Sequence, residues 1–85
     1  MYIEFDLSQP DDPTNKHDRI GILVTCLNID IDDWVRKHDI QYHKTKYHKN
    51  TYRLVLKNDE AYSHFALTWN PKYYISRRFK FKQPK

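Results

Sequence analysis

The stretch YHKTKYHK, residues 42–49, holds two Tyr-His-Lys triplets that only two residues separate. Histidine nitrogens are common zinc ligands, so His43 and His48 are the first candidates for metal chemistry. These two residues are five apart, which puts them on opposite faces of a regular strand. A zinc site also needs a third or fourth ligand, and no cysteine pair supplies one. The spacing therefore makes a metal improbable and predicts an exposed hairpin without a cofactor.

Three further features bear on enzyme chemistry. Asp30, Asp32 and Asp33 form a carboxylate cluster of the kind that holds Mg²⁺, although acids in the first turn of a helix give the same pattern. Cys26 beside a histidine would make a nucleophile pair, but its apolar neighbours in ILVTCL predict a buried position. Gly21 is the single glycine, which argues against Walker and dinucleotide phosphate loops. We therefore predict a protein that is not an enzyme, and rank a metal enzyme built on the carboxylates last.

Length and composition predict one small domain. The chain has 85 residues, 39% of them hydrophobic and 15% aromatic, which is enough for a modest core. No apolar run approaches the roughly 20 residues of a membrane helix. The first residues lack the basic start and apolar stretch of a signal peptide, and a lone cysteine suits a reducing compartment. We expect a single domain over residues 1–85 that works in the cytoplasm.

Charge is distributed unevenly along the chain. Residues 1–39 hold nine acidic and four basic side chains, whereas residues 40–58 hold five basic side chains and no acid. Residues 61–85 hold six more basic side chains, again without an acid, and the net charge of the whole chain is +4. An acidic front half joined to a basic back half hints at an anionic partner, although a solvated surface is the commoner cause of a single charge run.

Hydrophobic periodicity predicts the elements of the front half. Residues 2–7 alternate as a strand, and residues 8–15 contain two prolines and form a loop. Residues 20–27 fit a helical stripe, which we favour over a short buried strand. Residues 30–38 predict a second helical stretch in which Asp30 is the N-cap.

The back half reads as a hairpin, a helix and a last strand. Residues 40–47 and 51–57 predict two strands around a turn near residues 48–50. Asp59 opens the helix, and residues 72–82 alternate as the last strand. The apolar face of that helix repeats at helical spacing through Tyr62, Phe65, Ala66 and Trp69.

These elements predict an α+β fold. With the two front helical stretches counted as one broken unit, the order is βαββαβ, the order of a ferredoxin-like sandwich. In that layout two helices cover one face of an antiparallel sheet and leave the other face exposed. If residues 20–27 form a strand instead, the sheet gains a member and the topology changes.

A sheet that joins the hairpin and the last strand would gather the basic side chains of the back half on one surface. Cations neutralise phosphates and rings stack on unpaired bases, which is what RNA or single-stranded DNA requires. The RNA-recognition motif has this topology, but its glycine-containing signature is absent. The predicted binding residues are Tyr42, His43, Lys44, Lys46, Tyr47, Arg53, Tyr74, Arg78, Lys80 and Lys82.

Two alternatives for the partner stay open. The same surface would suit an acidic host protein, in which case the chain is an inhibitor or regulator of a host enzyme or defence complex. Unpaired sheet edges would also allow two copies of the chain to form a homodimer. No feature predicts contact with a membrane.

The segment TYRLVLKNDEAYSHFALTWNP, residues 51–71, resembles small accessory proteins of tailed, myovirus-type bacteriophages. The scarcity of glycine and the abundance of Asp, Asn, Lys and Tyr are similar too. The resemblance covers about a quarter of the chain and carries over no functional residue. It implies a viral protein made in the cytoplasm of an infected bacterium, where such proteins commonly bind host components or form parts of the virion.

Overall fold

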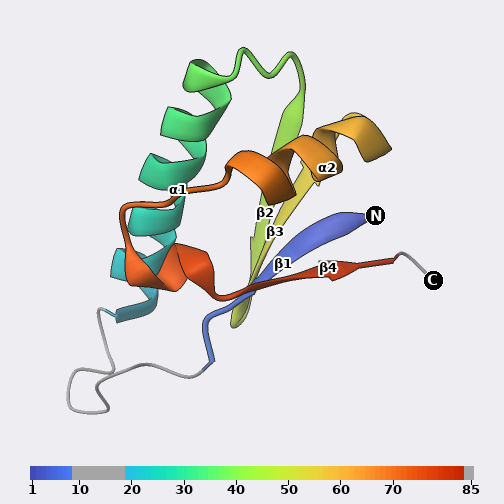
Figure 1. The fold of residues 1–85 in the computed structure, drawn as a ribbon. Helices are drawn as coiled ribbons and strands as arrows, with labels where there is room; N and C mark the ends of the chain where they lie inside the picture. Colours follow the sequence, from blue (N-terminus) through green and yellow to red (C-terminus); the bar gives the residue numbers. More distant parts are fainter. Residues whose placement is uncertain (9–18, 84–85) are drawn as a thin grey trace.

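The computed structural model describes residues 1–8 and 19–83, which form an α+β fold with two helices and a four-stranded antiparallel sheet (Figure 1). The predicted loop at residues 8–15 lies, apart from its first residue, outside the described part. Within that part no helix has the length and apolarity needed to cross a membrane. The elements are β1 (Tyr2–Asp6), α1 (Arg19–Lys37), β2 (His43–His48), β3 (Thr51–Leu56), α2 (Asp59–Thr68), the 3₁₀ helix η1 (Tyr74–Arg77) and β4 (Phe79–Lys82).

The strands lie in the order β2-β3-β1-β4, and each neighbouring pair is antiparallel. Residues directly opposite each other in an antiparallel pair point to the same face of the sheet. Ile3 is opposite both Leu54 and Phe81, and these three residues point to the face that carries the core. Tyr2 lies opposite Lys82, so the two ends of the described chain meet at one end of the sheet (Figure 1).

A single hydrophobic core joins both helices to one face of the sheet. Its aromatic centre is Phe65 of α2, whose ring stacks on Trp69 at a centroid distance of 4.6 Å and meets the edge of Trp34 at 5.1 Å. Because each strand alternates, the opposite face keeps its polar side chains in solvent. The buried core residues are Ile3, Phe5, Leu7, Leu27, Ile31, Trp34, Tyr52, Leu54, Leu56, Tyr62, Phe65 and Ile75.

Helix α1 runs without a break through the point where a second helix was predicted to begin. The prediction of helix for residues 20–27 is confirmed, but the prediction that Asp30 is an N-cap is wrong. Leu27, Ile31 and Trp34 continue one buried stripe at helical spacing, so packing carries the helix past Asp30.

The prediction of a strand over residues 72–82 is wrong for its first half. Residues 74–77 form η1, and β4 contains only residues 79–82. The buried Ser76 donates from Oγ to the Asp30 carboxylate at 2.5 Å, and Trp69 Nε1 donates to the Ser76 carbonyl at 2.8 Å. These tertiary hydrogen bonds hold residues 74–77 away from the sheet. The alternation of the sequence cannot predict them because the partners of Ser76 are distant in the chain or belong to another element.

The predicted hairpin and second helix are confirmed, with altered bounds. The Ile40 amide donates to the Val35 carbonyl and thus belongs to the end of α1, so β2 starts only at residue 43. Helix α2 begins at Asp59, and the side chain of Asn58 caps it by accepting from the Ala61 amide. Its apolar face is narrower than predicted because Ala66 is exposed.

Candidate nucleic-acid interface

The face of the sheet that points away from the core carries the cations of three strands. Lys46 of β2 lies opposite Arg53 of β3, and Lys80 of β4 lies opposite Glu4 of the intervening β1. Lys44 and Lys82 occupy positions of the same alternation, opposite Val55 and Tyr2 respectively. We call this surface the open face: Tyr2, Glu4, Asp6, Lys44, Lys46, His48, Thr51, Arg53, Val55, Lys80 and Lys82.

Two carboxylates on β1 divide the cations of the open face into two groups. Glu4 lies opposite Arg53 on one side and Lys80 on the other. Hydrogen bonds from the hydroxyl and the amide of Ser8 hold the pKa of Asp6 below its ordinary value, and the charges of Arg78 and Lys80 lower it further. Both acids are therefore flanked by positive charge.

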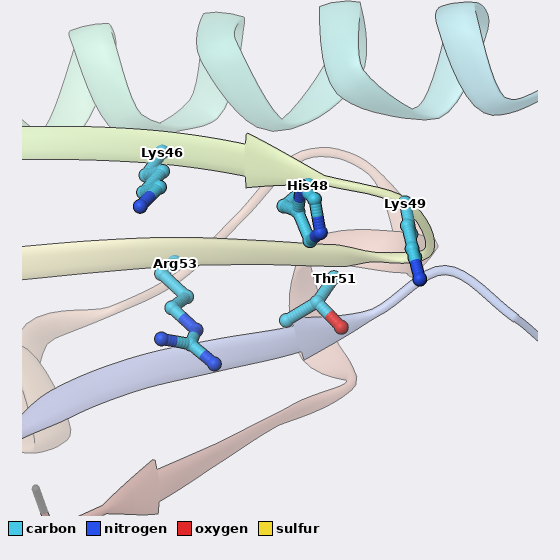
Figure 2. A pocket seen from close by; sticks show the side chains of 5 residues that line it. All are labelled: Lys46, His48, Lys49, Thr51 and Arg53. Carbon is cyan, nitrogen blue, oxygen red and sulfur yellow. The ribbon is translucent and has the colours of Figure 1, made fainter.

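A shallow hollow of about 240 Å³ lies on the open face at the turn between β2 and β3. Figure 2 shows the side chains that line it, and they come from both strands and from the turn itself. None of these side chains is acidic, and Thr51 adds a hydroxyl group that can donate a hydrogen bond. The hollow is lined by Lys46, His48, Lys49, Thr51 and Arg53.

One aromatic ring of the open face lies beside these cations. The Arg53 guanidinium carbon sits 4.7 Å from the centroid of the Tyr2 ring, a cation–π distance. Tyr2 is half-buried, and β1 is a central strand of the sheet. The pair places a ring that can stack on a base next to a side chain that can bind a phosphate.

The structure brings only part of the predicted binding residues together. Lys44, Lys46, Arg53, Lys80 and Lys82 share the open face. Arg78 immediately precedes β4 and lines a second hollow together with Asp6 and Lys80.

The predicted rings lie elsewhere. Tyr47 is opposite the buried Tyr52, and His43 is opposite the buried Leu56, so both point to the helix-covered face. Tyr74 belongs to η1 and not to a strand, which removes it from the sheet. Tyr42 is exposed but precedes β2. The predicted hairpin is thus divided between two faces, with His43 and His48 on opposite ones as their spacing indicated.

Sequence reasoning missed Tyr2, His48, Lys49 and Thr51. Strand alternation already separated Tyr2 from Ile3, Phe5 and Leu7 on the other side of the strand, and a turn was predicted near residues 48–50. The missing information was the pairing of strands, because only the register shows that β1 lies between β3 and β4 and that Tyr2 meets Arg53.

The carboxylate cluster at residues 30–33 is split by the helix. Asp30 is buried and accepts from the amides of Lys72 and Tyr73, while Asp33 is exposed and forms an ion pair with Arg36 at 3.1 Å. Within residues 1–8 and 19–83, no group of three or more metal-ligating side chains comes together.

The cysteine is less buried than the sequence predicted. Cys26 is half-buried and packs against the edge of the core. Burial raises the pKa of its thiol, and the nearby carboxylate of Asp30 raises it further. Both effects reduce the fraction of reactive thiolate at neutral pH.

Comparison with known proteins finds no matching family model, no similar curated protein and no similar solved structure.

Proposed function

We propose that the chain is a small, non-enzymatic protein that binds RNA or single-stranded DNA on the open face of its sheet. The observation that carries this proposal is the register, which places Lys44, Lys46, Arg53, Lys80 and Lys82 on one surface. Neutralised phosphates supply most of the affinity of such contacts.

The spacing of the cations favours an extended ligand. Neighbouring strands lie about 4.8 Å apart, so β2 and β4 are roughly 14 Å apart across the sheet. A single phosphate would contact cations on both strands only if the side chains leaned far across the sheet, whereas a strand of nucleic acid that crosses the sheet contacts them directly. The half-buried Tyr2 ring beside Arg53 would then contact an unpaired base between the two groups of cations.

We further infer that the fold is a ferredoxin-like sandwich and that the chain is an accessory protein of a tailed bacteriophage acting in the host cytoplasm. The order of strands and helices along the chain supports the first inference, with η1 as an addition before β4. The resemblance of residues 51–71 supports the second.

Fluorescence-anisotropy titrations with labelled single-stranded RNA, single-stranded DNA and duplex DNA test the proposed function. We expect the single strands to bind more tightly than the duplex, with log affinity falling linearly as log salt concentration rises. Absence of binding at low salt would overturn the proposal and direct the search to an acidic protein partner.

A further inference from the structure

The hollow at the β2–β3 turn carries more positive charge than one internal phosphate requires. Lys46, Lys49 and Arg53 line it together with Thr51 and His48, and no acidic side chain is among the lining residues. An internal phosphodiester carries one negative charge. A phosphate monoester carries roughly 1.5 to 2 negative charges at neutral pH and offers three acceptor oxygens.

The backbone of the turn fixes the position of Lys49. Lys49 has a φ of 54°, in the left-handed region that favours glycine or asparagine. The loop between β2 and β3 has only two residues, and such hairpin loops require a positive φ at their first residue, so the turn holds Lys49 in a defined place beside Thr51. Lys49 is one of the residues that line the hollow, and Figure 2 shows its side chain beside those of Thr51 and Arg53.

We propose that this hollow binds the terminal phosphate monoester of a nucleic-acid strand, an inference that rests on the proposed function. The Lys46 and Lys49 amines and the Arg53 guanidinium neutralise the dianion, and the Thr51 hydroxyl donates to it. Arg53 also covers the Tyr2 ring, so a phosphate held by Arg53 brings the adjoining base to that ring. The strand then continues across β1 towards Lys80 and Lys82.

The test compares one short single-stranded oligonucleotide with a 5′-phosphate, a 3′-phosphate or hydroxyl groups at both ends. We expect one of the two phosphorylated forms to bind at least about fivefold more tightly than the hydroxyl form, since charge-assisted hydrogen bonds are worth more than neutral ones. The arm that shows the gain identifies which end of the strand occupies the hollow.

The variant Lys49→Asn isolates the hollow from the rest of the open face. Asparagine tolerates the left-handed backbone, so the turn is retained while the charge is lost. The preference for a phosphorylated end should fall by at least about threefold, while binding of the hydroxyl oligonucleotide falls by less than about twofold. The matched control Lys37→Asn removes the same charge from the end of α1 and should keep the preference.

The outcomes separate the two proposals. Equal binding of all three oligonucleotides by the wild-type chain would overturn the terminal-phosphate site and leave the proposed function standing. A preference that Lys49→Asn leaves undiminished would also overturn the site, because Lys49 is one of the three cations assigned to the phosphate. Failure of every oligonucleotide to bind would overturn the proposed function and, with it, this inference.

Discussion

Asp30 is a polar residue at the centre of the fold. The residue is 4% exposed, and its carboxylate accepts from the amides of Lys72 and Tyr73 at 3.0 and 3.2 Å and from the Ser76 hydroxyl. These bonds fix the segment between α2 and β4, and thereby the start of the strand that carries Lys80. Asp30 is 42 to 46 residues away in sequence from the groups that it binds, and it thus helps to position the edge strand of the open face.

Replacement of Asp30 by alanine should lower the free energy of unfolding by about 3 kcal/mol, because the buried Ser76 hydroxyl and two part-buried amides lose their acceptor. Urea denaturation measures the change. The control Asp32→Ala removes an exposed carboxylate from the same helix and should change stability by less than about 0.5 kcal/mol. Equal effects of the two substitutions would show that the Asp30 bonds contribute nothing.

A histidine pair joins the end of α1 to α2. His38 Nδ1 and His64 Nε2 are 3.1 Å apart, and both rings lie beside Trp34. Partial burial lowers the pKa of His38, and the neighbouring His64 and Lys37 lower it further. The folded protein therefore resists protonation of His38 more than the unfolded chain does.

This shift has a defined sign for stability. The lowered pKa of His38 contributes to the free energy of unfolding. This contribution is fully present above the ordinary histidine pKa and is lost as the pH falls through the lower pKa of the folded state. We expect the urea midpoint of the wild type to fall between about pH 7.5 and pH 5, and to fall less in His38→Gln. The exposed His48 lies outside the pair, so His48→Gln serves as the control and should keep the wild-type profile. Identical profiles for wild type and His38→Gln would contradict this account.

Among the elements, the end of α1 shows how backbone geometry shapes the hairpin that follows. The Ile40 amide donates to the Val35 carbonyl at 3.0 Å and the Asp39 amide to the Arg36 carbonyl at 3.4 Å, the pattern of a Schellman motif. Asp39 occupies the left-handed position with a φ of 51°. Glycine is the usual residue there, and a negative charge is unfavourable at a helix C-terminus.

Asp39→Gly should therefore raise the free energy of unfolding by about 1 kcal/mol. Asp39→Ala removes the same charge but keeps a Cβ in the left-handed region, so it should be about 1 kcal/mol less stable than the glycine variant. Thermal denaturation of the two variants side by side measures the difference. A glycine variant no more stable than the alanine variant would count against the left-handed conformation.

The hydrophobic periodicity of the sequence predicted most of the helices and strands. The composition of the open face depends on which strands pair, and the sequence does not show this. Alternation and helical spacing in the sequence were enough to place β1, the hairpin and α2, and to favour helix over residues 20–27, but they did not show that α1 continues through Asp30. They were not enough for residues 74–77, where bonds to Asp30 and Trp69 override the strand-like alternation. They also left open which side of the hairpin faces solvent, since a one-residue change of register exchanges Tyr47 with Lys46.

At the scale of the whole molecule, basic residues that cluster in the back half of the sequence lie together on one surface of the sheet. The cations of the basic half were predicted to share one sheet, and those on β2, β3 and β4 lie on the open face. The rings that were predicted to stack on bases lie elsewhere, and Tyr2 of the acidic half takes their place beside Arg53. Only the strand order β2-β3-β1-β4 brings these two halves together.

The most direct test of the open face compares two double variants of equal net charge in the same anisotropy titration with single-stranded RNA. Lys46→Glu with Lys80→Glu reverses cations on both sides of the open face, whereas Lys37→Glu with Lys72→Glu reverses exposed cations outside it. We predict that the first pair weakens binding by at least about a hundredfold and reduces the slope of log affinity against log salt, while the second pair changes affinity by less than about fivefold. An equal loss in both pairs would show that net charge, and not the open face, determines binding.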